Sequence, residues 1–152
     1  MKIKQTKIES FIDTNILVYG VDLSLNNRSF HRASLEILRP NEQEILYLSP
    51  QILGEFYSVI TSANAVQNPS SPIEAFYRIK RLCQMPNIKV LSVNNNVQEK
   101  WLELLEIRPV KGGQVFDLLH LATMLTNNIK RIYTFNESDF NWYKDIEVII
   151  PN

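Results

Sequence analysis

Four acidic residues stand where carboxylates could take part in metal-assisted chemistry. Asp13 ends a short apolar run, Glu55 lies inside an apolar helical pattern and Asp117 begins another. Asp139 follows a later apolar run, in the segment TFNESDF. If such carboxylates converge, each raises the pKa of the others unless a cation neutralises them. Magnesium or manganese fits this need, because both prefer oxygen ligands and complete their shell with water and phosphate.

A pocket of acids with a hard cation is typical of phosphodiester hydrolysis, in which the cation activates water and stabilises the leaving oxygen. Each acid also has a simpler explanation. Asp13 could cap the following helix, and Asp139 could form a turn or a cap. Glu55 could face solvent, and Asp117 would be favoured near a helix N-terminus whatever its role. The apolar stripe beside Asp117 nevertheless places this acid at the border of the core.

The elements that would position these acids alternate between strand and helix. Strands are predicted over residues 9–13, 45–48, 88–93, 131–135 and 147–150. Helices are predicted from residue 14 onward and over residues 28–38, 49–63, 71–84, 95–107 and 115–127. This alternation predicts an α/β fold, with a central, mostly parallel sheet of about five strands and helices on both faces. In such folds, sites form beyond the carboxyl ends of the strands, which is where Asp13 lies.

Two helix starts are signalled by local sequence. Ser49 followed by Pro50 places a cap before a proline at the first helical position, where its missing N–H is not needed. Ser71 and Pro72 repeat this pattern, and Glu74 completes a capping box. These signals predict that the two helices begin at Pro50 and at Pro72.

Composition limits the class of protein. With 152 residues, of which 45% are hydrophobic and 21% charged, the chain suits a single domain spanning residues 1–152. Sixteen basic and sixteen acidic residues give a net charge of zero, so any nucleic-acid contact must come from a local patch. The absence of a long apolar segment and of a signal-like start predicts a cytoplasmic protein with no membrane span.

The counts of cysteine, histidine and glycine exclude several kinds of site. Cys83 is the lone cysteine, so no disulfide can form within the chain. Together with two histidines, it cannot supply a closed zinc site of the Cys/His type. The four glycines do not have the spacing of a dinucleotide fingerprint or of a phosphate loop.

Four short motifs follow one another along the chain. They are FIDTNIL over residues 11–17, SPQILGEF over 49–56, VFD over 115–117 with Leu121-Ala122, and TFNESDF over 134–140. In this order and spacing they resemble the PIN-domain nucleases, and in particular the VapC-type ribonuclease toxins of bacterial toxin–antitoxin pairs. The resemblance spans almost the whole chain and implies a PIN-like fold.

The resemblance implies roles for individual residues. Asp13, Glu55 and Asp117 would form the acidic core of a metal site, with Asn15 and Thr134 as supporting polar groups. Because the site would need only oxygen ligands, His120, one turn after Asp117, is expected to be a packed or hydrogen-bonded histidine.

The fourth acidic position departs from the family pattern. Many members carry an aspartate where this chain has Asn136, so Asp139 would supply the remaining carboxylate or the site would use three. Asparagine still offers a carbonyl oxygen to a cation. The departure leaves open an alternative, a catalytically impaired PIN-like module that binds RNA or protein without cutting.

The resemblance also implies partners. The substrate would be RNA, cut in single-stranded regions by metal-dependent hydrolysis, and the protein would form a homodimer. A cognate antitoxin would cover the active site, with the helices near Ser49 and Ser71 as groove walls. Backbone contacts could come from the basic residues Arg78, Lys80, Arg81, Arg108, Lys111, Lys130 and Arg131. Base stacking could come from Tyr57, Tyr77, Trp101 and Trp142, although solvated charge is the commoner explanation for the basic residues and core packing for the aromatic ones.

Two other α/β enzyme classes place an acid after the first strand. Phosphatases of the haloacid dehalogenase type need a second aspartate two residues later, where this chain has Asn15. A phosphoacceptor receiver domain would leave Glu55 unexplained. The sequence therefore favours the nuclease, with the binding module as the rival from another class.

Overall fold

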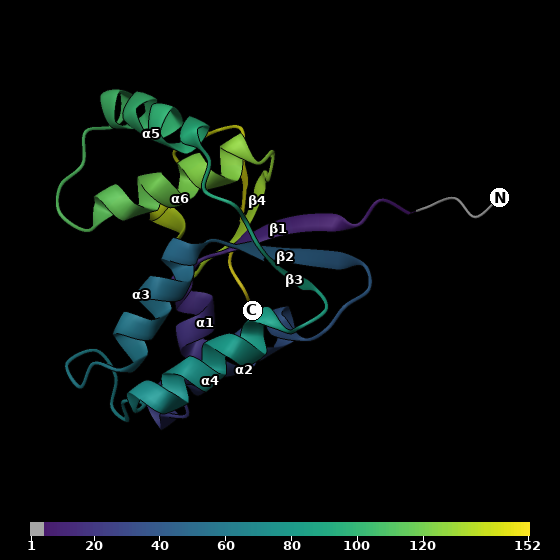
Figure 1. The fold of residues 1–152 in the computed structure, drawn as a ribbon, viewed down its shortest axis with the longest axis vertical. Coiled ribbons are helices and arrows are strands. Elements are labelled where there is room, and N and C mark those ends of the chain that lie inside the picture. The colour runs from purple at the N-terminus through teal and green to yellow at the C-terminus, as the bar shows by residue number, and fades with distance from the viewer. Residues whose placement is uncertain (1–4) are drawn as a thin grey trace.

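The computed structural model describes residues 5–152, and its centre is a five-stranded parallel sheet (Figure 1). Residues 1–4, which the predicted domain includes, lie outside the described part. The sheet order is β3-β2-β1-β4-β5, and each neighbouring pair is parallel. The strands are β1 (Ile8–Ile12), β2 (Glu44–Leu48), β3 (Ile88–Val90), β4 (Arg131–Tyr133) and β5 (Glu147–Ile149).

Helices cover both faces of this sheet. Figure 1 shows α5 and α6 on one side, and α1, α2 and α4 on the other, with α3 beside α1. The helices are α1 (Thr14–Val21), α2 (Arg28–Leu38), α3 (Pro50–Ile60), α4 (Pro72–Cys83), α5 (Asn95–Ile107) and α6 (Gln114–Thr126). Short 3-10 turns are η1 (Leu25–Asn27) and η2 (Glu137–Asp139). The predicted α/β fold, with a central parallel sheet of five strands and helices on both faces, is confirmed.

The two helix starts signalled by sequence have the expected caps. The Ser49 hydroxyl accepts a hydrogen bond from the Ile52 N–H at 3.2 Å, and Pro50 opens α3. In α4, the Ser71 hydroxyl accepts from the Glu74 N–H at 3.3 Å, and the Glu74 carboxylate accepts from the Ser71 N–H at 2.7 Å. Local side-chain chemistry therefore decides where both helices begin.

Several elements end earlier than predicted. β3 stops at Val90, not at residue 93, because its partner β2 ends at Leu48, which pairs with Val90. β4 stops at Tyr133, not at residue 135, because its neighbour β1 has ended at Ile12. α3 ends at Ile60 instead of continuing to residue 63.

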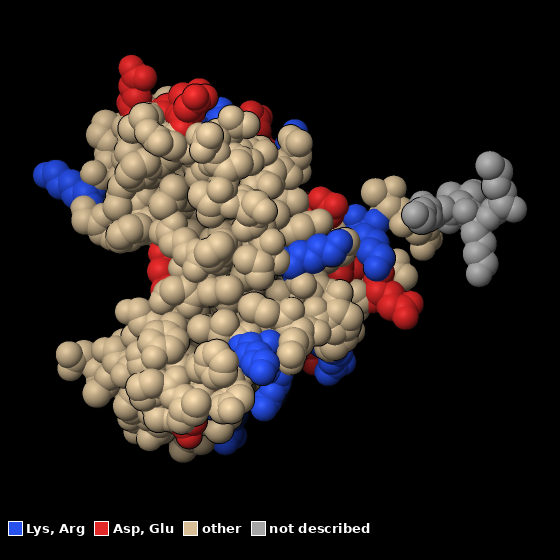
Figure 2. Space-filling view, in the orientation of Figure 1, with Lys and Arg blue, Asp and Glu red and all other residues tan. Residues whose placement is uncertain are grey.

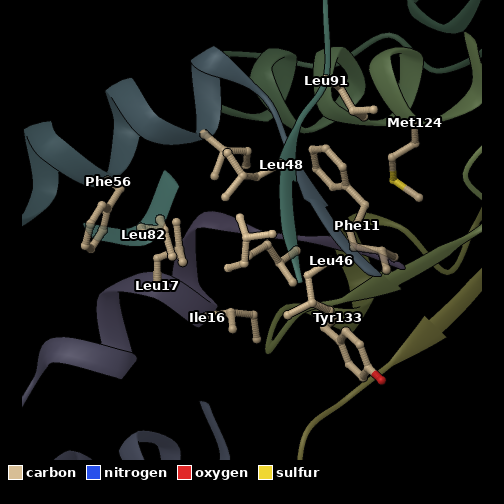
Figure 3. Close-up of a cluster of buried hydrophobic side chains, with 14 of the residues drawn as sticks. Phe11, Ile16, Leu17, Leu46, Leu48, Phe56, Leu82, Leu91, Met124 and Tyr133 are labelled. Carbon is tan, nitrogen blue, oxygen red and sulfur yellow. The ribbon is translucent and has the colours of Figure 1, made fainter. Parts of the chain in front are cut away.

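The core falls into two clusters that hold the two helical groups in place. The larger one joins the sheet to α1, α3 and α4 and is shown in Figure 3, where the labelled side chains include Phe11, Leu46, Ile16, Phe56 and Leu82. The smaller one joins α5 to α6 through Val97, Leu104, Leu118, Leu121 and Ala122. Burying each large apolar side chain contributes about 1.5–3 kcal/mol. None of the helices within residues 5–152 is long and apolar enough to cross a membrane.

Candidate active site

A cavity of about 740 Å³ opens where the carboxyl ends of the strands meet α3 and α6. Its lining includes Asp13 after β1, Glu55 on α3, Asp117 on α6 and Asn136 after β4. Figure 2 shows the corresponding notch between the part of the molecule that carries α5 and α6 and the part that carries α3. Acidic side chains are visible at the base of the notch. The structure thus brings three of the four candidate acids to one cavity.

Asp13 is held rigidly at the floor of this cavity. Its Oδ1 accepts from the Thr14 N–H at 2.7 Å, so the carboxylate does cap α1. Its Oδ2 accepts from the Thr134 hydroxyl at 2.7 Å and from Asn15 Nδ2 at 3.3 Å. Burial raises the pKa of Asp13, against the opposing effects of the charge of His120 and of these hydrogen bonds. Asp13 therefore both caps α1 and lines the cavity.

The two predicted supporting residues lie beside Asp13. Thr134 is fully buried, and its hydroxyl also accepts from the Asn136 N–H at 3.0 Å. The amide of Asn15 donates to Thr134 at 3.3 Å, and its oxygen accepts from the Phe135 N–H at 3.3 Å. These bonds join the ends of β1 and β4 around one carboxylate. The roles of Thr134 and Asn15 in a reaction stay predictions.

Glu55 turns toward the cavity, not toward solvent. Its Oε2 accepts from the Thr14 hydroxyl at 2.7 Å and from His120 Nε2 at 3.0 Å. Its Oε1 accepts from Gln51 Nε2 at 3.2 Å. Burial raises the pKa of Glu55, but the hydrogen bond and charge of His120, with the bonds from Thr14 and Gln51, bring it below its ordinary value. Glu55 is therefore ionised at neutral pH.

Asp117 is in a different position, because its carboxylate has no hydrogen bond or ion pair within residues 5–152. Burial and the negative charges of Asp139 and Asp13 raise the pKa of Asp117 from 3.8 to about 7. No lysine or arginine of the described residues lines the cavity to offset this charge. The site therefore carries negative charge that the described side chains leave unbalanced.

Asn136 and Asp139 are the two candidates for the fourth ligand of the site. Asn136 lines the cavity, whereas Asp139 is not part of its lining. Asp139 still lies close enough to raise the pKa of Asp117. Its own pKa is raised by burial, against the opposing effect of Arg108. The choice of Asp139 as a fourth ligand stays a prediction.

Several residues of the site were not predicted from sequence. Thr14 and Gln51 hold Glu55, and Tyr19 and Phe116 line the cavity. Thr14, Gln51 and Phe116 lie inside the motifs FIDTNIL, SPQILGEF and VFD, whereas Tyr19 lies outside them. His120, expected to be a packed or hydrogen-bonded residue, is buried and bonded to a candidate acid.

The basic and aromatic residues proposed to contact RNA lie elsewhere. None of the seven basic residues or four aromatic residues lines the acidic cavity. Arg131 is at the far end of its strand, where it pairs with Glu147 at 3.0 Å. Trp101 and Trp142 pack against the smaller core cluster. Arg131 therefore forms an ion pair, and the core-packing alternative describes what the structure shows for Trp101 and Trp142.

The donor set suits a hydrated oxygen-loving cation. Among residues 5–152, no three acidic, histidine or cysteine side chains lie close enough together to form a ready-made metal cage. Asp117 and the second lone pair of Glu55 Oε1 are free, and Asn136 adds an amide oxygen nearby. Magnesium binds proteins through one or two carboxylates and keeps water and phosphate as its other ligands. The residues present fit this mode of binding.

Comparison with known proteins gives a consistent result. The family model described as PIN domain matches residues 10–144. The VapC ribonuclease Mb2897 of Mycobacterium bovis is 27% identical over 117 residues, which cover 77% of this chain and 79% of that protein. Ribonuclease VapC43 of Mycobacterium tuberculosis matches with the same identity and coverage.

Solved structures share the fold at low sequence identity. VapBC2 from Rickettsia felis, bound to a DNA fragment from its promoter, has a TM-score of 0.65 at 16% identity and covers 95% of this chain and 100% of that chain. Mycobacterium tuberculosis VapC20, a Sarcin-Ricin loop cleaving toxin, has a TM-score of 0.65 at 18% identity and covers 91% and 98%. VapBC-1 from Haemophilus influenzae has a TM-score of 0.62 at 20% identity and covers 94% and 98%.

Proposed function

This chain belongs to the PIN domain family, and we propose that it is a metal-dependent endoribonuclease, the toxin of a toxin–antitoxin pair. One observation carries the proposal. Asp13, Glu55 and Asp117 come from three separate elements and line one cavity, and no lysine or arginine of the described residues lines that cavity to balance them. Such an arrangement costs stability unless a cation binds, so it is best explained as a binding site. The names of the similar proteins support ribonuclease activity as the use of that site.

Magnesium or manganese is the proposed cofactor. Asp117 and Glu55 would hold the ion with Asp13 and the amide oxygen of Asn136, and Asp139 is the candidate for a further carboxylate. When bound, the cation activates a water molecule for attack on the phosphodiester and stabilises the leaving oxygen. The hydrogen bonds from the Thr134 hydroxyl and the Thr14 N–H keep the carboxylate of Asp13 in one orientation. Fixed ligands of this kind need no reorganisation when substrate arrives.

The walls of the cavity offer apolar surface to the bases of RNA. Phe116 is 50% exposed beside Asp117, and Tyr19 of α1 also lines the cavity. Because aromatic side chains stack on unpaired bases whatever their identity, this favours single-stranded RNA as the substrate. The scissile phosphate would then contact the cation, which explains how the cavity can act without a basic lining.

A second cavity suits the proposed antitoxin. It encloses about 470 Å³ between α1, α2, α3 and α4, with an apolar lining that includes Phe56 and Leu82. Arg39, Arg78 and Arg81 also line it. An apolar segment with acidic residues would complement it, and α3 and α4 are the groove walls expected from the resemblance. Structures of toxin–antitoxin complexes with this fold support such a partner.

The remaining parts of the proposal concern the state of the protein in the cell. We propose that residues 1–152 form a single domain that acts in the cytoplasm on cellular RNA. We also propose a homodimer, for which the exposed Leu102 and Ile107 of α5 offer apolar surface. Light scattering of the purified protein measures its oligomeric state directly.

The competing function is a PIN-like module that binds RNA or protein without cutting. The observation that favours it is the presence of Asn136 in the cavity, at a position where many family members carry aspartate. Such a module would bind RNA without cleaving it, with any added metal. Changing Asn136 to aspartate would then be the first step toward restoring cleavage.

The test is cleavage of total cellular RNA by purified, antitoxin-free protein with magnesium, manganese or chelator. We expect discrete fragments that depend on metal and are lost in Asp117→Asn, which removes charge at nearly constant volume. Asp145→Asn is the matched control, because Asp145 is exposed and has no hydrogen bond or ion pair within residues 5–152. Intact RNA with a folded wild type under every metal condition would reject the nuclease and favour the binding module.

A further inference from the structure

His120 is a buried histidine with a single polar contact. Its side chain is 2% exposed, and its Nε2 lies 3.0 Å from Oε2 of Glu55. Its other ring nitrogen, Nδ1, is buried and has no hydrogen-bond partner within residues 5–152. The ring therefore directs all of its polar chemistry at one carboxylate of the candidate site.

The direction of this hydrogen bond follows from the charge of its partner. Both carboxylate oxygens of Glu55 accept hydrogen bonds from other donors, Oε2 from the Thr14 hydroxyl and Oε1 from Gln51 Nε2, as an ionised carboxylate does. A carboxylate only accepts hydrogen bonds, so Nε2 must carry the hydrogen. This holds whether the imidazole is neutral or protonated, since Nε2 donates in both forms. The contact is thus an Nε2–H bond donated to Glu55.

This bond completes the fixation of the Glu55 carboxylate. Oε2 receives two donors, the Thr14 hydroxyl and His120 Nε2, and both of its lone pairs are used. Oε1 receives only Gln51, so one lone pair on this oxygen stays available. Without His120, Oε2 would keep a single donor, and the carboxylate could rotate away from the cavity. His120 therefore helps to decide which oxygen is presented.

The same histidine links two helices whose main packing partners differ. α6 packs chiefly against α5, and α3 packs against α1 and α4 (Figure 1). His120 lies three residues after Asp117, so both side chains project from one face of α6. Through its bond to Glu55, 65 residues away in sequence, it joins that face to α3. The spacing between two candidate metal ligands thus depends on this contact.

We propose that His120 is a positioning residue, which holds Glu55 across the cavity from Asp117 in the orientation that binds the catalytic cation. The inference rests on the proposed function, because it assigns His120 a role only if the acids bind metal. It predicts that what matters is an N–H donor at the place of Nε2, and not the ring or its charge. A residue that merely fills the core would show no such requirement.

Two substitutions of His120 distinguish a donor that reaches Glu55 from a side chain that only fills the core. Glutamine places an amide N–H close to the position of Nε2, whereas asparagine carries the same amide closer to the backbone, near Nδ1. Because Nδ1 has no partner, the glutamine variant loses no other hydrogen bond. The pair His120→Gln and His120→Asn therefore compares the same functional group with and without the reach to Glu55.

The experiment measures manganese binding to antitoxin-free wild type and both variants by calorimetry. We expect asparagine to weaken binding by about 10- to 100-fold and glutamine to weaken it much less. In RNA cleavage, asparagine should lower kcat at a fixed manganese concentration and leave KM for RNA unchanged, because the buried ring cannot reach RNA. Equal manganese affinities for the two variants would overturn the proposal.

The experiment distinguishes failure of the proposed function from failure of the proposed role of His120. Wild type that binds no manganese would reject the proposed function and the role of His120 together. Wild type that binds manganese, with variants that differ only in thermal stability, would reject the role of His120 alone. If asparagine prevents folding, nitrogen NMR of the wild-type histidines still decides. Added magnesium should shift the Nε2 resonance of His120 more than its Nδ1 resonance, and equal or absent shifts would overturn the proposal.

Discussion

Replacing Asp117 by asparagine should stabilise the metal-free protein while it abolishes RNA cleavage. Burial and the negative charges of Asp139 and Asp13 raise the pKa of Asp117 from 3.8 to about 7. Between these two values the folded protein retains a proton that the unfolded chain releases, so the free energy of unfolding falls as pH rises through this window. Above pH 7 the full penalty is present. Asparagine cannot ionise, and the variant escapes the penalty.

The magnitude follows from the same shift. A difference of about 3 pKa units corresponds to a ceiling of about 4 kcal/mol. Water screens a half-buried carboxylate, so we expect about 1–2 kcal/mol at pH 8. For a chain of this size, this gives a rise in Tm of about 2–8 °C for Asp117→Asn. At pH 5 the gap between variant and wild type should be smaller.

The assay is thermal unfolding in chelator at pH 5 and pH 8, with Asp145→Asn as the control for the same chemical change on the surface. Excess manganese should reverse the order of Asp117→Asn and wild type. Wild type gains about 2.7 kcal/mol at a metal concentration 100 times its Kd, and the variant gains less. A variant that melts below wild type at pH 8 without metal would refute the reasoning, as would a gap that is the same at both pH values.

Three further predictions test other parts of the structure. Asn136→Asp adds a carboxylate to the cavity, so calorimetry should show manganese binding tightened by about tenfold, or about 1.4 kcal/mol, and no tightening would argue that residue 136 does not face the ion. Phe116→Ala should raise KM for single-stranded RNA by about tenfold with kcat little changed, in line with the loss of one stacked base, and an unchanged KM would remove Phe116 from the RNA contact. Ser71→Ala removes the cap of α4, so unfolding should show a loss of about 1 kcal/mol with cleavage retained, and equal stability would mean that the capping box contributes nothing.

Element starts could be predicted because their causes are local. Ser71 and Glu74 satisfy the first free N–H groups of α4 through neighbours in sequence. Element ends were predicted less well. Val90 ends β3 because Leu48 ends the strand beside it, and that pairing is invisible in the sequence around residue 90. Helix caps formed by neighbouring residues could be recognised in the sequence, whereas the pairing of distant strands could not.

The candidate acids were also found from sequence, since residue type and position at a strand end or helix start already suggest chemistry. Asp13, Glu55 and Asp117 were selected in this way, and the structure places all three in one cavity. The hydrogen bonding of each carboxylate could not be predicted. Asp13 and Glu55 are held by hydrogen bonds from threonines, whereas Asp117 has no such bond within residues 5–152.

The sequence by itself determined the α/β alternation, the net charge of zero and a set of oxygen ligands without a cysteine cluster. Tertiary structure alone decided that His120 would meet Glu55 and that Asp117 would lie near two other acids. The reason is physical. A pKa and a hydrogen bond depend on water and charge within a few ångströms, and folding brings together groups that lie far apart along the chain.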